Sequence, residues 1–136
     1  MEFTINLIEE NDYEKFCKWW KFWRWKPIEK ELLPNNGLGG LKITDENGVD
    51  VCVGFLYETN SGIAWIEFII SNPEIKDTEI RSEGRKKLIM YLTLHAENKG
   101  FKVVFSSLEN ENLINEFKAN GYFESKNKTK ELTIKF

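Results

Sequence analysis

The chain opens with alternating apolar and polar residues, MEFTINLI over residues 1–8, a pattern that predicts a half-buried strand. The apolar spacing then changes to three and four residues, which predicts a helix with Tyr13, Phe16, Cys17, Trp20 and Trp23 on its apolar face. Asn11 or Asp12 would cap this helix, and Pro27 blocks its simple continuation.

Three strands in series are expected next, over residues 38–44, 49–58 and 63–71. The pair Asn47-Gly48 separates the first two, and the segment TNSG separates the last two. Both are signals for tight turns, so this part of the chain predicts an antiparallel meander.

The second half of the chain alternates helices and strands. After Pro73, apolar residues recur at helical spacing up to Gly100, at Leu88, Ile89, Leu92 and Ala96. The stretch KVVFSS predicts a short buried strand, residues 110–120 a second helix, and residues 122–125 and 129–136 two closing strands. The predicted order is therefore β-α-β-β-β-α-β-α-β, an α+β fold with a mixed, mostly antiparallel sheet, in one domain spanning residues 1–136.

Composition and charge narrow the class of protein. With 41% hydrophobic and 30% charged residues, a globular fold is favoured over disorder. The net charge of −3 offers no general attraction to nucleic acid or anionic membrane, so neither is expected as a partner. The apolar runs 63–70 and 88–94 are too short to span a bilayer, and the polar N-terminus does not resemble a signal peptide, which predicts a cytoplasmic protein.

The residues that most often mark metal or thiol chemistry do not cluster. Cys17 and Cys52 belong to no Cys-x-x-Cys or Cys/His group and are interpreted as reduced thiols that fill the core. His95, the single histidine, lies beside the apolar stripe of the long helix, where packing or the surface is favoured over catalysis. No metal site is expected.

Three motifs make the chain resemble the GNAT family of acyl-CoA N-acyltransferases over nearly its whole length. WIEFIISNP, residues 65–73, resembles the family's fourth strand, with Glu67 at its acidic position. RSEGRK, residues 81–86, resembles the pyrophosphate signature at Arg81 and Gly84, with Lys86 where a small residue is usual. The spacing of the late helix is matched by Asn110, Leu113, Phe117, Gly121 and Tyr122, with Leu113 in place of Ala and Phe117 in place of Tyr. The aromatic first helix also resembles that of small acetyltransferase-like proteins encoded by phages.

The resemblance implies an N-acetyltransferase that carries an acetyl group from acetyl-CoA to an amine. Glu67 would be the general base, since it is the only ionisable side chain in IAWIEFII and shares a strand face with Trp65 and Ile69. Main-chain N–H groups of Ile69, Ile70 and Ser71 would serve the pantetheine arm and the oxyanion, with Asn110 near that arm. Arg81, Gly84, Arg85 and Lys86 would hold the pyrophosphate. Phe117 has no proton to donate, so the thiolate would leave unassisted.

Two of these assignments have a structural alternative. Glu67 could point into solvent from the polar face of its strand. Asp77 or Thr78 could cap the long helix directly, which would place Gly84 inside the helix and leave only the basic side chains to meet phosphate.

The segment WWKFWRW, residues 19–25, has more aromatic rings than one helix face can bury. Trp20, Trp23 and Trp25 are candidates to bind the acceptor substrate. The rings could instead cover the sheet, or stack on single-stranded nucleic acid with the interleaved Lys and Arg residues. A second hypothesis follows: a catalytically inactive GNAT-like module that binds or inhibits a partner through this aromatic helix.

Overall fold

A computed structural model describes all 136 residues and contains one five-stranded sheet in the order β1-β2-β3-β4-β5. The strands are β1 (Phe3–Leu7), β2 (Gly40–Asp45), β3 (Asp50–Glu58), β4 (Ile63–Ser71) and β5 (Val103–Phe105). The first three pairings are antiparallel and the β4–β5 pairing is parallel, which confirms the mixed, mostly antiparallel sheet. The predicted meander is confirmed to within two residues at each strand end.

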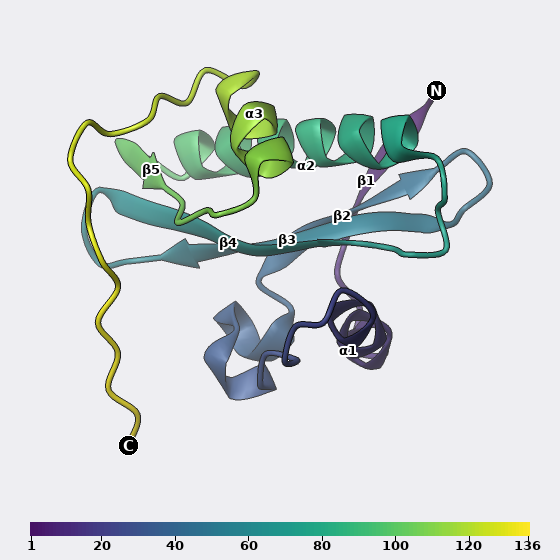
Figure 1. The fold of residues 1–136 in the computed structure, drawn as a ribbon, viewed down its shortest axis with the longest axis horizontal. Coiled ribbons are helices and arrows are strands. Elements are labelled where there is room, and N and C mark those ends of the chain that lie inside the picture. The colour runs from purple at the N-terminus through teal and green to yellow at the C-terminus, as the bar shows by residue number, and fades with distance from the viewer.

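Helices cover both faces of the sheet (Figure 1). α2 (Thr78–Asn98) and α3 (Glu111–Lys118) lie on one face, and α1 (Asp12–Phe22) lies on the other with two short 3₁₀ turns, Lys30–Leu32 and Pro34–Gly37. Each face of the sheet therefore packs against its own layer of helices or turns, with a separate hydrophobic core between them.

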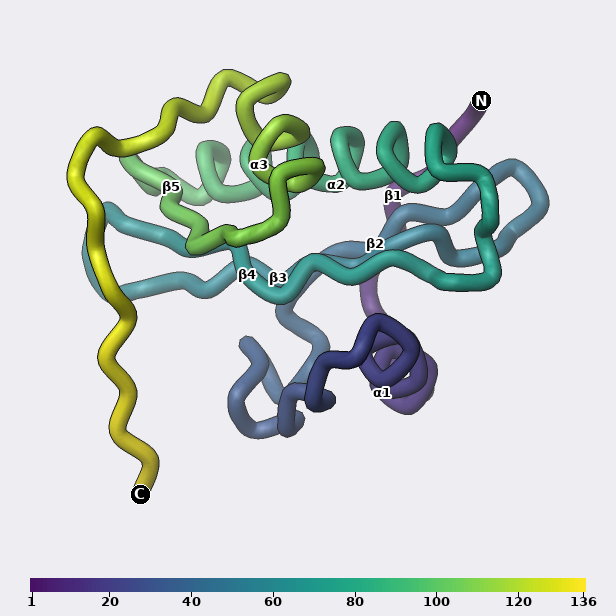
Figure 2. The backbone as a smooth tube through the Cα atoms, viewed as in Figure 1, coloured from purple at the N-terminus to yellow at the C-terminus, as the bar shows by residue number.

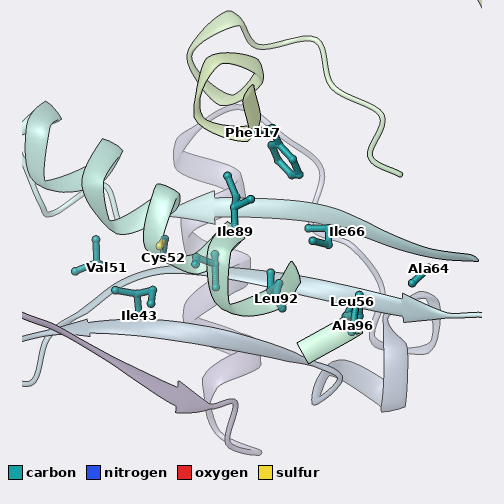
Figure 3. Packing of buried hydrophobic residues seen from close by; sticks show 11 residues of the cluster. Ile43, Val51, Cys52, Leu56, Ala64, Ile66, Ile89, Leu92, Ala96 and Phe117 are labelled. Atoms are coloured by element: carbon teal, nitrogen blue, oxygen red, sulfur yellow. The ribbon is translucent and has the colours of Figure 1, made fainter. Parts of the chain in front are cut away.

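The core beneath α2 contains the stripe expected from helical spacing. Leu88, Ile89, Leu92 and Ala96 are all fully buried, and they pack on strand residues such as Ile43 and Ile66 (Figure 3). Burying a Leu or Ile side chain completely contributes roughly 1.5–3 kcal/mol, so this stripe is a main source of stability.

The core beneath α1 is aromatic. Phe16, Trp20 and Phe55 have no exposed surface, and the rings of Trp20 and Phe55 stack with centroids 6.3 Å apart. α1 ends at Phe22, before Pro27, because the chain turns back on the helix: the N–H of Trp25 donates to the carbonyl of Trp20 (2.8 Å), and Arg24 adopts φ 64°. This is the Schellman type of helix end, whose left-handed position is usually a glycine.

A buried ion cluster ties α1 to the sheet. Lys42 Nζ lies 2.9 Å from a carboxylate oxygen of Asp12 and 3.1 Å from one of Asp50, and Lys15 contacts both carboxylates. Burial alone would raise the pKa of Asp12, but the N–H of Glu9 and the two ammonium groups outweigh it and hold this pKa below its usual value. Nothing in the sequence pattern predicted this cluster, because its members come from three different elements.

The two predicted closing strands are wrong, so the order ends at α3 instead of at a strand. No residue after α3 pairs with a strand; the chain runs past the end of the sheet toward the α1 face (Figure 2), and Lys135 comes within 3.8 Å of Glu29. Residues 131–136 alternate as a strand would, yet Leu132 is 95% exposed. The outer edge of the three-residue β5 therefore remains open, because an alternating pattern forms a strand only where a sheet edge receives it.

Candidate active site

β4 pairs with β5 only over its first three residues, which match the whole length of β5. Ile63 to Trp65 pair with Val103 to Phe105, and β4 then continues to Ser71 with no strand beside it on that side. Ile69, Ile70 and Ser71 all lie in this unpaired stretch. A strand edge that diverges in this way leaves main-chain groups open to a ligand.

A β-bulge interrupts β4 within the same stretch. The register with β3 changes from Val53 opposite Ile70 to Phe55 opposite Glu67, and Phe68 has φ 59°. One extra residue therefore lies in β4, and it reverses the faces of the residues beyond it. The expectation that Glu67 shares a face with Ile69 is wrong for this reason: Ile69 packs on the α2 side.

Glu67 lies instead in a groove on the α1 side with Trp65 and Phe68. This groove has a volume of about 600 Å³, and its apolar wall also includes Tyr57 from β3 and Leu32 from the first 3₁₀ turn. This volume is large enough for a small ligand, and the aromatic residues that form its wall are not the ones expected from the sequence.

The Glu67 carboxylate is half-buried and held in place. One of its oxygens accepts a hydrogen bond from the main-chain N–H of Ser107 at 2.7 Å. Burial raises the pKa of Glu67, the Ser107 hydrogen bond opposes that rise, and the nearby carboxylate of Glu131 adds to it. A carboxylate with a raised pKa in an apolar groove is suited to accept a proton from a bound amine.

Tyr57 is the site residue that sequence reasoning missed. Its hydroxyl donates to the carbonyl of Leu32 at 2.7 Å, and burial, with a smaller effect of Glu67, raises the pKa of Tyr57 to about 12. The TNSG turn could have revealed it, because a hairpin centred there places Tyr57 directly opposite Trp65.

The expected phosphate cradle at Gly84 is not formed. Asp77 caps α2, and its carboxylate accepts from the N–H groups of Glu79 (2.9 Å) and Ile80 (3.4 Å). Gly84 therefore lies inside the helix, where a Cβ would come within 2.7 Å of Val51 Cγ1. The glycine lets α2 approach β3 closely, and the expectation that it binds the cofactor is corrected.

Arg85 is likewise committed within the protein. Its guanidinium makes two hydrogen bonds to the buried carboxylate of Glu116 (2.6 and 2.7 Å) and one to Ser71 Oγ (2.8 Å). Ser82 donates to the same carboxylate. Arg85 joins α2, α3 and β4 from inside the protein, and its expected contact with pyrophosphate stays a prediction.

The remaining phosphate candidates, Arg81 and Lys86, are partly exposed. Arg81 donates to the carbonyl of Ile75 (2.6 Å) and lies over the ring of Trp23 at 5.5 Å, and Lys86 pairs with Glu83 on the surface. Their contact with phosphate stays a prediction. Asn110 caps α3 by accepting from the N–H of Leu113, and its place beside a pantetheine arm also stays a prediction.

The three tryptophans expected to bind substrate are separated by the fold. Trp20 is fully buried in the core, so its assignment to the substrate site is wrong. Trp23 is half-buried and donates from Nε1 to the carbonyl of Ser71 (2.9 Å), and Trp25 is 53% exposed. Neither lines the groove, where Trp65 takes the aromatic role. The direction of each ring depends on how α1 rotates against the sheet, which spacing alone does not reveal.

Other expected features have structural roles. Phe117 is buried, and its ring meets that of Tyr122 edge to face at 4.9 Å.

Burial raises the pKa of Cys52, which keeps that thiol protonated. No three metal-ligating side chains gather into a possible metal site. No helix combines the length and apolar character needed to cross a bilayer.

Comparisons with known proteins find similarity in structure alone. No protein-family model matches the sequence, and no curated protein matches it. The solved glucosamine-6-phosphate N-acetyltransferase of Arabidopsis thaliana is similar with a TM-score of 0.63 and 16% identity, over 100% of this chain and 99% of that one. A GNAT family acetyltransferase of Staphylococcus aureus gives 0.61 and 16%, over 98% and 100%. AAC(6')-Iy, solved with a bisubstrate analogue of CoA, gives 0.64 and 16%, over 98% and 99%.

This chain therefore has the GNAT fold, as its sequence motifs predicted. The likeness to small phage-encoded proteins stays a prediction.

Proposed function

We propose that this protein transfers the acetyl group of acetyl-CoA to an amine bound in the groove beside Glu67. The observation that carries the proposal is the coincidence of three features on β4: the divergence from β5, the bulge at Phe68, and the half-buried carboxylate just before it. Together they bring an open strand edge and a proton acceptor to one point.

The reaction needs a neutral amine, and Glu67 is placed to provide it. An amine enters the groove as a cation and passes one proton to the Glu67 carboxylate, whose position Ser107 maintains. The amine nitrogen then forms a bond to the thioester carbonyl carbon. The carbon–sulfur bond breaks, and the electron pair leaves with the sulfur as a thiolate. This thiolate takes the second proton from the amine nitrogen, so the products are an amide and the free CoA thiol, and Glu67 releases its proton to solvent. A thiol pKa of about 8.5 makes this group a tolerable leaving group, so Phe117 in place of a proton donor slows the reaction without preventing it.

The residues that would hold acetyl-CoA match its pantetheine arm better than its phosphates. No strand pairs with the edge of β4 from Ile69 to Ser71, so its N–H groups suit a pantetheine arm, although the carbonyl of Ser71 already accepts from Trp23 Nε1. The N-terminus of α2 offers less to the phosphates, because the Asp77 carboxylate already accepts from two of its N–H groups. We propose that the partly exposed side chains of Arg81 and Lys86 contact the phosphates directly.

The test of catalysis is thiol release from acetyl-CoA with a panel of primary amines, for the wild type and Glu67→Gln. The substitution removes the base and keeps the shape, so the rate should fall roughly 10²- to 10⁴-fold. Glu58→Gln is the matched control, since Glu58 also lines the groove but pairs with Lys99 on the surface. A folded Glu67→Gln variant with the full rate would remove the base assignment.

A second candidate is a GNAT-shaped module without CoA chemistry that acts through its aromatic first helix. The self-capped start of α2 and the commitment of Arg85 to Glu116 favour it. Calorimetric titration with acetyl-CoA separates the two candidates. Micromolar binding weakened by Arg81→Ala/Lys86→Ala supports the enzyme, and no heat at millimolar ligand supports the module.

A further inference from the structure

The surface at the C-terminal end of α1 has unpaired positive charge and exposed rings. We call it the basic-aromatic surface and define it by Lys18, Lys21, Phe22, Arg24, Trp25 and Lys76. All six residues are exposed, and none of the four cations makes an ion pair. Phe22 and Trp25 are 56% and 53% exposed.

The charge here opposes that of the rest of the molecule. Residues 18–26 contain four basic and no acidic residues, which is a charge of +4. Since the chain carries −3 overall, the remaining residues carry −7. A local basic surface on an acidic protein attracts a short anionic segment, whereas a long polyanion would also meet the acidic remainder.

Backbone strain points to the same surface. Four residues other than glycine have positive φ, and two of them are asparagines, which tolerate that conformation. The other two are Phe68, which forms the bulge of the proposed transfer site, and Arg24, which occupies the position where helices usually end in glycine. The helix dipole favours cations at this end but does not require one at the strained position itself. Arg24 therefore keeps a cation at the surface at the expense of stability.

The rings favour a protein over a nucleic acid. Lys76 Nζ lies 5.7 Å from the ring centre of Phe22, and the ring of Trp23 meets Phe22 nearly at right angles. Within this surface, Trp25 is thus the one exposed ring without such a neighbour, and a single ring makes a poor platform for successive stacked bases. Both rings suit apolar side chains of a protein surrounded by acidic ones.

We propose that the basic-aromatic surface binds an acidic segment of a protein partner, one that presents apolar side chains to Phe22 and Trp25. The surface lies outside the Glu67 groove, so this holds whether or not the chain transfers acetyl groups. Binding would be strongest at low salt, because exposed charges provide much of the attraction.

The test uses fluorescence anisotropy with labelled synthetic peptides. The main probe is rich in Asp and Glu and carries two leucines at helical spacing. Three further probes are a peptide with Asn and Gln in place of the acids, a peptide with Ser in place of the leucines, and oligo(dT) of matched length. The full chain should bind the main probe more tightly than the other three, and should lose affinity as salt is raised.

Arg24→Gly gives the sharpest variant, because it removes the cation and relieves the strain together. It should weaken peptide binding ~5-fold or more and raise the melting temperature, while any acetyl transfer to a small amine stays unchanged. Lys128→Ala, an exposed change far along the chain, is the matched control and should alter neither quantity.

Three outcomes would overturn the proposal: equal binding of the acidic and neutral peptides, tighter binding of oligo(dT) than of the acidic peptide, or unchanged binding by a folded Arg24→Gly variant. None of them bears on Glu67, so a failure here is distinct from a failure of the proposed acetyl transfer.

Discussion

The groove beside Glu67 and the start of α2 both matched family motifs, but the groove has polar groups open to a ligand, whereas most polar groups at the start of α2 are already paired within the protein. In the groove, a half-buried carboxylate meets an open apolar space and an unpaired strand edge. At the start of α2, Asp77 caps the N–H groups and Arg85 is neutralised by Glu116. The difference teaches that a polar group left open inside the fold is a better guide to a ligand site than a match in residue spacing.

The largest effect should come from breaking the Arg85–Glu116 pair. Glu116→Ala leaves a guanidinium in the interior without its carboxylate, which should lower the free energy of unfolding by about 3–5 kcal/mol. Urea denaturation measures this loss, with Glu111→Ala on the exposed side of α3 as the control. Arg85→Met/Glu116→Leu should recover most of the stability. A loss below about 1 kcal/mol for Glu116→Ala would mean that Arg85 is available to a ligand after all.

The next largest effect on stability should come from a substitution at Gly84. Gly84→Ala should lower the free energy of unfolding by about 1–2 kcal/mol, because the clash with Val51 exceeds the gain in helix propensity. Thermal denaturation of Gly84→Ala with and without Val51→Ala checks this, since the smaller neighbour should relieve the clash. An undiminished melting temperature together with lost acetyl-CoA binding would restore Gly84 to the cofactor site.

Two substitutions at Asp77 distinguish the effect of its capping hydrogen bonds from the effect of its negative charge. Asp77→Ala should cost about 1 kcal/mol of stability through the lost cap, whereas Asp77→Asn keeps an acceptor and should cost little. Both changes remove a negative charge where phosphates would approach, so both should tighten acetyl-CoA binding in a calorimetric titration. Weaker binding by Asp77→Asn would show that the carboxylate serves the ligand.

The smallest effect concerns the pH dependence of stability. Burial raises the pKa of Glu67 above its ordinary value of 4.5, so the folded state holds this proton more tightly than the unfolded chain does. Its contribution is complete below the ordinary value and is lost as pH rises through the raised pKa. Glu67→Gln should therefore gain stability relative to the wild type between acidic and neutral pH, measured by melting curves. A constant difference across that range would contradict the raised pKa.

Local periodicity predicted most of the fold. The stripe from Leu88 to Ala96 and the meander up to Ser71 depend on residues close in sequence, so spacing and turn chemistry were enough. The closing strands failed because their formation depends on whether a distant edge accepts them. The pairing of Arg85 with Glu116 escaped prediction for a related reason, since the two residues are 31 positions apart in the sequence and lie on different helices.

The site was predicted in part. Glu67 stood out as the single charge in an apolar strand, and it does lie in a groove. The bulge at Phe68 was not predicted, because the alternating pattern of residues gives no sign of a positive φ at a phenylalanine. That one inserted residue decides which neighbours face Glu67, and it depends on the pairing of β4 with β3 and not on the local sequence pattern.

The open edge of β5 has a consequence for handling the protein at high concentration. Val103 and Phe105, each 44% exposed, lie on a strand whose outer main-chain groups have no partner strand, and Leu132, Ile134 and Phe136 form an unpaired alternating segment in the same molecule. Exposed edges and apolar alternating segments are the elements from which intermolecular β-pairing begins. Lys and Glu residues within the tail act as gatekeepers against this pairing. Colloidal stability should therefore depend on salt and pH more than on the strength of the two cores.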